Sequence, residues 1–562
     1  MEVSTMCYFV GVVVIFVSYA LRLLNLVWFK PKKTEKLLRE QGLQGNSYKF
    51  FFGDLKEMVH LIVQAKSKPI GLTDDIVSRI IPFVHKSVST HGKVCFTWMG
   101  HKPVLQVSEP CMIREIYANY HQFQKPRGGN PLSKLLVKGL IDTDADQWIK
   151  HRKIINPAFH VDKLKHMVPA FYVSCIEMIN KWEEMLTKQS ACEVDVWPYL
   201  QSFTSDVISR TAFGSSFEEG RKIFQLQREQ AELIIKAEQS IYIPGSRFLP
   251  TQSNMRIKEI DREVRASIRS IINKRVIMLK VGGIKNDDLL GILLDSNYKE
   301  IKQQGNLNFG LTIEEVIEEC KLFYFAGQET TGNMLVWTMI LLSQYTNWQA
   351  RARNEVLDIF GEKKPDIDGL SRLRVVSMIF NEVLRLYPPG AALGRMIHEE
   401  TKVGNITLPA GTHIQLNALL VHHDRDLWGD DAKEFNPERF SKGVSKATNG
   451  QASYIPFGAG PRICIGQNFA MMEAKLALTP SKDNLTKNVN RYKHFNFGKG
   501  CKKHVLPFEN VNRYKHYNFG DDKCTKRKVF KIGLANKRPA VLPVWKFNGF
   551  GGSMLDRSQD RL

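Results

Sequence analysis

The chain has 562 residues, of which 43% are hydrophobic and 24% are charged, a globular composition that excludes a disordered or fibrous protein. Its formal net charge of +22 suits an anionic membrane surface, an acidic protein partner or a nucleic acid. Much of the excess, 19 Lys and Arg against 6 Asp and Glu, falls in residues 481–562, so the main body is only mildly basic and no nucleic-acid partner is expected. The nine cysteines are odd in number and form no CxxC pair, which indicates a reducing compartment rather than a disulfide scaffold.

The amino end predicts a membrane anchor. Residues 7–29 are apolar except for Ser18, Arg22 and Asn25, and a helix of this length, at ~1.5 Å per residue, crosses a hydrocarbon core of ~30 Å. A run of lysines begins at Lys30, which by the positive-inside rule places the rest of the chain in the cytosol. A cleaved signal peptide is the alternative, but Arg22 interrupts the apolar run and no small-residue cleavage site follows it.

Residues 31–480 are expected to form one domain behind an anchor of residues 1–30, because no Gly/Ser linker or low-complexity run interrupts them. Helical periodicity dominates, for example from His160 onward, so the expected fold class is mainly α with a minor β-sheet. The longest helix is expected to begin at Thr312, since Thr312 and Glu315 have the spacing of a capping box. The strand candidates are KVCFTWMG, KPVLQVS and KVGNITLPAGTHIQLNA, the last with Gly411 in a turn.

Two polar motifs in the helical part of this domain each have a plainer alternative. Trp148 and Arg152, in DQWIKHRK, are one helical turn apart and face the same way, although a basic amphipathic surface would give the same pattern. Further on, AGQETT places Glu329 and Thr330 in an apolar helix, where glycine and threonine allow the helix to open. A packing patch of small residues is the alternative there, but it leaves a costly carboxylate unexplained.

A third motif combines charges from two segments. Glu382 and Arg385 lie three residues apart and share one helix face, and Arg439 in FNPERF supplies a second cation. Exposed pairs of this kind are common and contribute little to stability. If the three side chains are buried together, each depends on the others, because losing one leaves an unpaired charge.

Cys464 lies in a glycine-rich loop that runs into an amphipathic helix from Gln467. Gly458, Gly460 and Gly466 let the backbone turn tightly around the sulfur and point N–H groups at it, and such donors tune a metal thiolate. The helix aims its positive amino-terminal end at the same place. A buried structural cysteine is the alternative.

The spacing of Phe457, Gly460, Arg462, Cys464 and Gly466 fits FxxGxRxCxG and resembles the haem-binding loop of the cytochrome P450 superfamily. The other motifs match this family in the expected order: WxxxR its haem-propionate motif, AGQETT its oxygen-activation motif, and ExxR with PERF its structural triad. The resemblance spans the whole predicted domain. FQKPRGGNP, DQWIKHRKIINPAFH and HHDRDLWGDDAKEFNPERF are similar to a plant microsomal subgroup, the clan that contains secologanin synthase and triterpenoid and gibberellin oxidases.

This resemblance implies a cytochrome P450 fold and a bound haem b whose iron takes a cysteine thiolate as its axial ligand. It also implies a role for each motif residue. Cys464 binds the iron with Phe457 beside the sulfur; Trp148, Arg152, Arg395 and Arg462 bind the haem propionates; Glu329 and Thr330 relay protons during oxygen activation; and Glu382, Arg385 and Arg439 form a structural triad.

The implied function is a haem-dependent monooxygenase that inserts one atom of O2 into a lipophilic, terpenoid-type substrate. Its electrons would come from a membrane-bound NADPH–cytochrome reductase with an acidic face. The surface on the cysteine side should therefore be basic, with His151 and Lys153 as candidates. The resemblance places the protein in the endoplasmic reticulum membrane as a single-pass protein with a cytosolic catalytic domain.

After Thr479 the chain departs from the family pattern. Pro480 would end the last helix early, and residues 481–562 form an atypical basic tail with near-duplicate blocks from Asn488 and Asn510. We expect a poorly ordered segment from an altered gene end, with single-stranded nucleic-acid binding and an irregular zinc site as alternatives. The rival function is a membrane-anchored haem-binding protein that is catalytically inactive because this region is aberrant.

Overall fold

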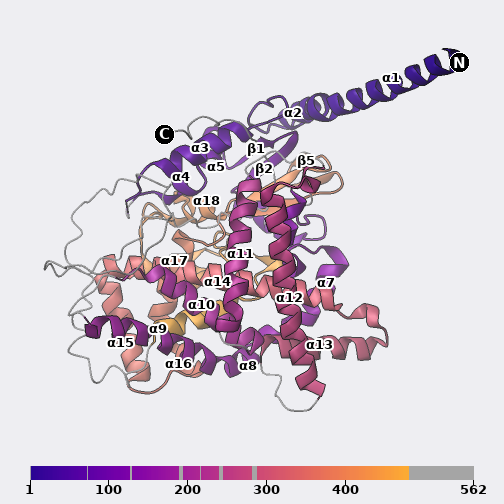
Figure 1. The fold of residues 1–562 in the computed structure, drawn as a ribbon. Coiled ribbons are helices and arrows are strands. Elements are labelled where there is room, and N and C mark those ends of the chain that lie inside the picture. Colours follow the sequence, from indigo (N-terminus) through magenta and orange to yellow (C-terminus); the bar gives the residue numbers. More distant parts are fainter. Residues whose placement is uncertain are drawn as a thin grey trace, which may run out of the picture.

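The structure is a computed structural model that describes residues 2–71, 74–126, 130–188, 194–214, 217–238, 245–280 and 288–479. Over these residues the chain is mostly helical with two small sheets, which confirms the expected fold class (Figure 1). The expectations for Pro480 and for the tail of residues 481–562 lie outside the described residues.

The amino-terminal helix projects away from the rest of the molecule (Figure 1). It runs without a break through α1 (Glu2–Leu24), the π-helical turn η1 (Asn25–Phe29) and α2 (Lys30–Glu40). Among the described helices it is the one that is long and apolar enough to cross a membrane, which fits the expected anchor. Its last part packs on the domain, because Leu38 is buried in the hydrophobic cluster around the main sheet.

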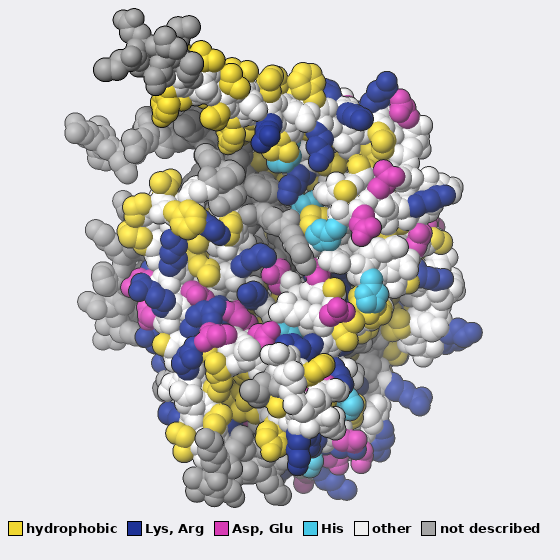
Figure 2. All heavy atoms as spheres, turned by 90° about the vertical axis from the view of Figure 1, so that its right-hand side faces the viewer, with side chains coloured by type: hydrophobic (Ala, Val, Ile, Leu, Met, Phe, Trp, Pro, Cys, Tyr) yellow, Lys and Arg dark blue, Asp and Glu magenta, His cyan; other side chains and the backbone are white. Residues whose placement is uncertain are grey.

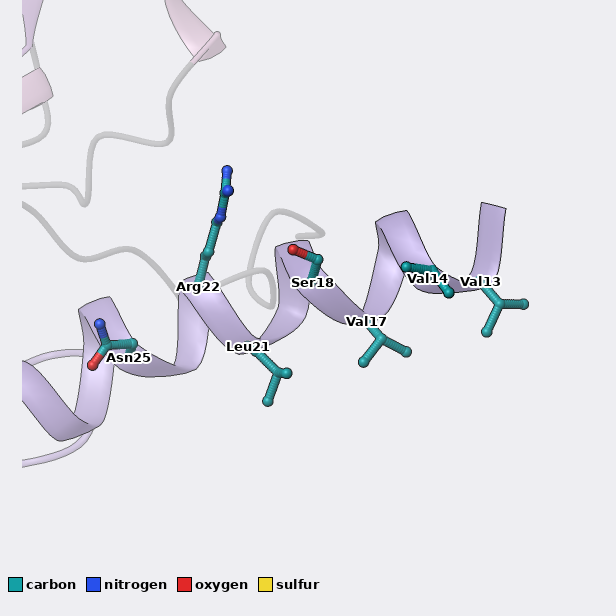
Figure 3. A pocket seen from close by; sticks show the side chains of 7 residues that line it. All are labelled: Val13, Val14, Val17, Ser18, Leu21, Arg22 and Asn25. Carbon is teal, nitrogen blue, oxygen red and sulfur yellow. The ribbon is translucent and has the colours of Figure 1, made fainter. Parts of the chain in front are cut away.

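A shallow hollow runs along α1 (Figure 3), and the side chains that line it are Val13, Val14, Val17, Ser18, Leu21, Arg22 and Asn25. Arg22 and Ser18 project from one side of the helix, and Val17 and Leu21 project from the other. Because α1 stands apart from the domain, this hollow belongs to the anchor and the candidate site lies elsewhere. Hydrophobic side chains gather along the upper edge of the molecule, whereas Lys and Arg are interspersed with Asp and Glu over its body (Figure 2).

Four strands form a mixed sheet in the order β1, β2, β6, β3, and two more form a separate hairpin. The strands are β1 (Val94–Met99), β2 (Lys102–Val107), β3 (Leu393–Met396), β4 (Thr401–Val403), β5 (Ile406–Leu408) and β6 (His413–Leu416). β1 is antiparallel to β2, β6 is parallel to β2, and β3 is antiparallel to β6 with Arg395 opposite Ile414.

The strand candidates are confirmed, with one difference in how they pair. The stretch expected to fold around a turn at Gly411 contributes to both sheets. β5 pairs with β4 across a tight turn at Gly404, and the turn at Gly411 then carries the chain into β6 of the larger sheet. Both glycines have a positive φ, which a residue with a side chain rarely adopts.

The remaining helices follow in chain order. The first group is α3 (Leu55–Ser67), α4 (Ile76–Ile80), α5 (Pro82–His91), α6 (Pro110–Ala118), η2 (Pro131–Leu135) and η3 (Gly139–Ile141). The middle group is α7 (Ala145–Ile155), η4 (Asn156–Phe159), α8 (Val161–Leu164), η5 (Lys165–Met167), α9 (Val168–Lys188), α10 (Val196–Phe213), α11 (Phe217–Glu238), η6 (Ser246–Phe248), α12 (Gln252–Lys280), α13 (Leu289–Gln304), η7 (Leu307–Phe309) and α14 (Ile313–Gln344). The last group is α15 (Thr346–Phe360), α16 (Ile367–Arg372), α17 (Arg374–Leu386), α18 (Ala418–His422), α19 (Arg425–Trp428), η8 (Pro437–Phe440), α20 (Val444–Ala447), η9 (Gly460–Arg462) and α21 (Gln467–Ala477).

The long helix α14 is the centre of the domain: most of its residues are buried, and its buried apolar side chains belong to the largest hydrophobic cluster. Its predicted start is confirmed: the Thr312 hydroxyl accepts the N–H of Glu315 at 3.2 Å, and the Glu315 carboxylate accepts the N–H of Thr312 at 2.8 Å. The periodic run from His160 does not form one helix. It divides into α8, η5 and α9, because Pro169 has no N–H to continue the hydrogen-bonding ladder.

The junction between anchor and domain is held by Tyr48. Its hydroxyl donates a hydrogen bond to the carbonyl of Val27 in η1. The buried Tyr48 ring packs edge-on against Trp98 of β1, with 5.0 Å between ring centroids, and Trp28 contacts the same ring at 6.2 Å. The base of the anchor is therefore tied directly to the main sheet.

Candidate functional site

The loop that carries Cys464 is shaped by its own backbone. The Cys464 N–H donates to the carbonyl of Phe457 at 2.9 Å, which closes the loop between η9 and the preceding turn. Gly458 and Gly460 have φ of +73° and +66°, in the left-handed region. A Cβ at Gly460 would also lie 2.8 Å from the carbonyl oxygen of Tyr117. This tight turn therefore requires glycine at position 460.

The sulfur of Cys464 lies against backbone and aromatic groups. Its side chain is exposed, yet burial among neighbouring groups raises the pKa of the thiol, while the Gly466 N–H and the Arg152 charge act to lower it. A Cβ at Gly466 would sit 4.0 Å from the sulfur and 3.9 Å from the ring of Phe159. The Phe159 ring in turn contacts Phe323 of α14, with 5.7 Å between centroids. The cysteine loop thus lies beside α14.

Four basic side chains, Lys125, Arg152, Arg395 and Arg462, gather next to this loop, and we call them the cation cluster. Arg395 on β3 is buried, and Arg152 on α7 donates from Nη1 to the carbonyl of Ile463 at 3.0 Å. Burial lowers the pKa of Arg462 to about 10. Burial, followed by the charges of Arg395 and Arg462, holds the pKa of Lys125 well below its usual range.

One buried acid, Asp144, lies against the cation cluster. Its carboxylate is 3.1 Å from Nη2 of Arg462, and its Oδ1 also accepts the backbone N–H of Lys125 at 2.9 Å. The Thr143 carbonyl accepts Nη1 of Arg462 at 2.9 Å. The Nε atoms of Arg395 and Arg462 are buried and have no hydrogen-bond partner among the described residues. The cluster therefore holds buried donors that an anion could accept from.

Aromatic rings support two of the guanidinium groups. The Cζ of Arg462 lies 4.7 Å from the ring centroid of Trp148, and that of Arg395 lies 5.2 Å from the ring of Tyr117. Trp148 and Arg152 do lie on one side of α7, because both contact the loop at residues 462–463. The weakly hydrated guanidinium group suits such stacking better than an ammonium would.

The AGQETT segment gives α14 an exposed strip within an otherwise buried helix. Ala326 and Thr330, one turn apart, are exposed, and the Thr330 hydroxyl donates to the Ala326 carbonyl at 2.8 Å. The Glu329 carboxylate lies 4.0 Å from Nε of Arg228 on α11, with 18% of its side chain exposed. Within the described part of the chain, no hydrogen bond links Thr330 to the cysteine loop.

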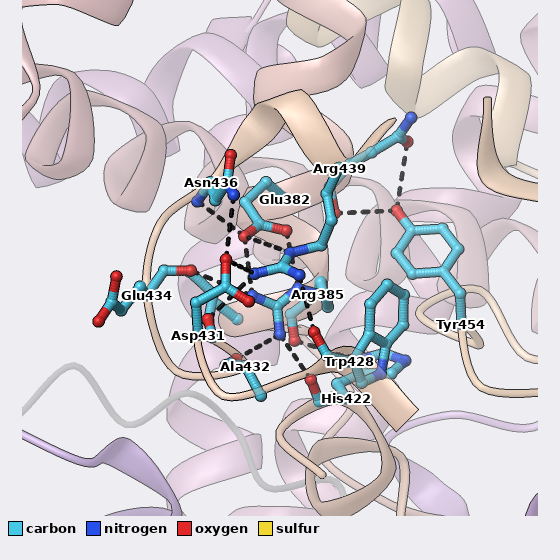
Figure 4. Close-up of polar contacts among 12 residues, drawn as sticks. Glu382, Arg385, His422, Trp428, Asp431, Ala432, Glu434, Asn436, Arg439 and Tyr454 are labelled. Atoms are coloured by element: carbon cyan, nitrogen blue, oxygen red, sulfur yellow. Dashed lines mark hydrogen bonds and ion pairs between the residues drawn. The ribbon is translucent and has the colours of Figure 1, made fainter. Parts of the chain in front are cut away.

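Glu382, Arg385 and Arg439 meet in one buried network (Figure 4). Nε and Nη2 of Arg385 donate to the two carboxylate oxygens of Glu382, each at 2.7 Å, and both side chains are fully buried. Nε of Arg439 lies 3.4 Å from the same carboxylate. Arg385 also donates to the main-chain carbonyls of His422 and Ala432, so the network joins α17 to the chain between β6 and η8.

The structure corrects the expected role of His151 on a partner surface. His151 is 1% exposed, its Nδ1 lies 2.5 Å from Glu319, and its Nε2 lies 3.4 Å from Glu315. The prediction is wrong for His151 because α7 turns this residue inward against α14. Lys153 is exposed, as a surface residue should be, and pairs with Glu300 of α13 at 2.7 Å.

Lys125, Asp144 and Glu473 are not among the predicted site residues. The first two lie in segments of mixed polarity, and nothing local indicates that they meet an arginine far along the chain. The position of Glu473 could have been predicted from the sequence. It follows Phe469 by four residues, so it lies on the apolar face of α21, where it is fully buried. Burial raises the pKa of Glu473 well above its usual range, and the hydroxyl of nearby Thr331 acts to lower it.

These residues fit a haem. That group carries two propionate carboxylates at one edge and an iron that takes a thiolate. Arg395 and Arg462 offer buried donors without a partner among the described residues, and charge-assisted bonds to carboxylates are the strong ones. Cys464 offers a sulfur beside the Gly466 N–H, which is the kind of donor that tunes a metal thiolate.

Comparison with known proteins agrees with this arrangement. A family model described as Cytochrome P450 matches residues 78–480, more than half of the chain. Cytochrome P450 CYP72A219 of Panax ginseng is 60% identical over 467 residues, which cover 83% of this chain and 90% of that protein. Cytochrome P450 72A13 of Arabidopsis thaliana is 53% identical over 481 residues, covering 85% and 93%. The 7-deoxyloganic acid hydroxylase of Catharanthus roseus is 52% identical over 473 residues, covering 83% and 91%.

Fold, site and matches together define an oxidoreductase of the monooxygenase class with a haem-iron cofactor. The chain belongs to the cytochrome P450 family, and within it to the plant CYP72 group. Family membership implies, in general terms, a redox partner, O2 and a lipophilic substrate. The predicted family and enzyme class are thereby confirmed.

Proposed function

We propose that this protein is a membrane-anchored monooxygenase that inserts one oxygen atom from O2 into a lipophilic, terpenoid-type substrate. Its electrons come from NADPH through an NADPH–cytochrome reductase. The substrate class is supported by the similarity to a Catharanthus roseus protein named as a 7-deoxyloganic acid hydroxylase. The observation that carries the haem chemistry is the cation cluster beside Cys464, whose buried Nε donors have no partner in the described part of the chain.

Cys464 binds the haem iron through its sulfur, and Phe457 packs beside it. The hydrogen bond from the Cys464 N–H to the Phe457 carbonyl holds the sulfur in place before the iron binds. The Gly466 N–H favours the thiolate over the thiol, and so does the positive charge of Arg152. The bound haem supplies oxygen activation, to which a thiolate ligand contributes electron density.

Arg152, Arg395 and Arg462 bind the haem propionates. The buried Nε atoms of Arg395 and Arg462 would donate to the propionate oxygens, which would give each of these atoms the partner that the described residues do not supply. Trp148 keeps Arg462 in place through its ring face. These contacts would hold the propionate edge of a bound haem beside the cysteine loop.

Glu329 and Thr330 move protons toward the reacting oxygen. The Thr330 hydroxyl can accept a proton at Oγ1 while it donates its own, and the Glu329 carboxylate can take up and release a proton. The exposed position of Thr330 leaves its Oγ1 accessible, and its bond to the Ala326 carbonyl sets the direction of its proton. Arg228 lies close enough to Glu329 to restrict where the carboxylate points.

The triad of Glu382, Arg385 and Arg439 has a structural role in this proposal. It joins α17 to the segment that leads through η8 to the cysteine loop. Its effect on catalysis is indirect, through the position of that loop.

The absorption spectrum of the reduced, carbon-monoxide-bound full chain tests the proposal. We expect a Soret band at the position typical of thiolate-ligated haem, and Cys464→Ala should abolish it. Cys111→Ala is the matched control, because Cys111 is also exposed but lies on α6. An absent band, or a band of the thiol type, in the wild-type chain would overturn the proposed haem-thiolate chemistry.

A second candidate is an anchored haem protein without turnover, which the aberrant sequence of residues 481–562 favours. Such a protein would give the thiolate band but no NADPH-dependent product. An assay distinguishes the active enzyme from the inactive haem protein. The chain is incubated with NADPH, a plant reductase and either 7-deoxyloganic acid or another terpenoid acid, and the product is detected by mass spectrometry. A product with one added oxygen supports the enzyme, and a thiolate band without any product across the panel supports the inactive protein.

We further propose that residues 1–30 are a single-pass anchor in the endoplasmic reticulum, that residues 31–480 form a cytosolic catalytic domain, and that residues 481–562 are an atypical basic tail. Asn405 tests the topology, because it begins an N-x-T pattern and is exposed in the turn between β4 and β5. A lumenal domain would present it for glycosylation. Endoglycosidase treatment should leave the mobility of the microsomal protein unchanged, and a shift would place the domain in the lumen.

A further inference from the structure

Asp144 immediately precedes α7 and connects two distant parts of the site. The residue is 6% exposed and lies against the cation cluster. Its carboxylate binds Arg462 and the backbone N–H of Lys125, and Arg462 lies 318 residues away in sequence. One side chain therefore joins the segment of Lys125 to the loop of Cys464.

The Arg462 guanidinium is held at two of its three nitrogens. The Thr143 carbonyl accepts Nη1 at 2.9 Å, the Asp144 carboxylate accepts Nη2 at 3.1 Å, and the Trp148 ring lies against the face at 4.7 Å. Nε is left as a buried donor with no partner among the described residues. With both terminal nitrogens held in this way, Nε is the nitrogen of Arg462 that remains to donate to an anion.

Asp144 also offsets part of the positive charge of the cluster. Its carboxylate lies 3.1 Å from Nη2 of Arg462, and its charge acts to raise the pKa of Lys125, which burial and then the charges of Arg395 and Arg462 lower. Without this carboxylate, less negative charge would offset the repulsion among Lys125, Arg395 and Arg462. The charge felt by a bound haem would become more positive.

We propose that Asp144 is a positioning residue for the haem: it orients Arg462 toward the propionates and supplies a fixed negative charge that lowers the reduction potential of the bound iron. The inference rests on the proposed haem-thiolate function. Reduction from ferric to ferrous iron adds one electron, delivered by the reductase, and makes the site more negative. A carboxylate nearby opposes that change, so the ferric form is favoured while Asp144 is present.

Variants of the full chain, loaded with haem, separate charge from structure. Asp144→Asn removes the charge and keeps an acceptor oxygen, whereas Asp144→Glu keeps the charge. Asp142→Asn is the matched control, because Asp142 has the same charge two residues earlier but lies 3.5 Å from the half-exposed Lys134. Spectroelectrochemical titration measures the ferric/ferrous midpoint potential of each variant.

We expect a higher potential in Asp144→Asn, a potential close to wild type in Asp144→Glu, and a smaller rise in Asp142→Asn. Asp144→Ala should also release haem to apomyoglobin about tenfold faster than wild type, since a charge-assisted hydrogen bond to Arg462 is lost. Asp144→Asn should release it more slowly than Asp144→Ala.

Equal potentials in wild type and Asp144→Asn, or equal shifts in Asp144→Asn and Asp142→Asn, would overturn the inference. If Asp144→Asn holds no haem, Asp144→Glu decides, because a shifted potential in that variant contradicts the charge effect. A wild-type chain without a thiolate band would instead contradict the proposed function. The two failures are therefore distinguishable.

Discussion

Glu382→Gln removes the acid that the triad shares. Glu382 and Arg385 are fully buried, and only 11% of the Arg439 side chain is exposed, so the variant leaves two guanidinium groups against a neutral amide. Removing one partner of a buried ion pair costs about 3–5 kcal/mol, because the remaining charge is no longer compensated. We expect the free energy of unfolding to fall by this amount.

Urea denaturation of the purified chain, followed by tryptophan fluorescence and by haem absorption, measures the loss. Glu259→Gln is the matched control. Arg256 and Glu259 are also three residues apart and 2.8 Å from each other, but 33% and 51% of their side chains are exposed. An exposed pair contributes less than about 1 kcal/mol. Equal losses in the two variants would refute the view that burial, not distance, gives the triad its effect.

Three further outcomes are expected. Gly460→Ala should speed haem transfer to apomyoglobin more than Gly450→Ala does. Both glycines have a positive φ, but only at Gly460 would the added Cβ lie 2.8 Å from a main-chain carbonyl oxygen. Equal transfer rates in the two variants would contradict this expectation. Burial raises the pKa of Glu473 above its ordinary value of 4.5, so the folded chain keeps a proton there that the unfolded chain releases. The free energy of unfolding should therefore fall as the pH rises above about 4.5, and this fall should be less steep in Glu473→Gln. Urea midpoints measured across the pH range test this. Parallel curves for wild type and Glu473→Gln would contradict it. His151→Leu should lower the unfolding free energy by about 1–3 kcal/mol, because the buried Glu319 loses its hydrogen-bond partner. An unchanged urea midpoint would show that this contact does not contribute to stability.

What the sequence predicts correctly depends on residues a few positions apart. The capping box at Thr312 places the start of α14, and the short extended stretches KVCFTWMG and KPVLQVS place β1 and β2. The glycines at 458 and 460 indicate a tight loop, and both adopt a positive φ. Local chemistry of this kind needs no knowledge of the rest of the chain.

What the sequence does not predict depends on contacts across the chain. The periodicity of α7 puts Trp148 and Arg152 on one side, but it cannot tell that His151 faces inward, because its partner Glu319 lies 168 residues away. Asp144 gives no local sign of its contact with Arg462. The roles assigned to the motif residues stay predictions until the variants above are measured.

The unbroken helix from α1 through η1 to α2 has a consequence for how the domain would sit on a membrane that α1 crosses. The bond from Tyr48 to the carbonyl of Val27 fixes the anchor to the main sheet. The direction in which the domain faces around the helix axis therefore depends on the number of residues between α1 and Val27. Each residue of an α-helix turns the chain by about 100°, so inserting one residue at the end of α1 would rotate the domain relative to the side of α1 that carries Ser18 and Arg22. An anchor built in this way would determine the direction in which the domain faces as well as its attachment.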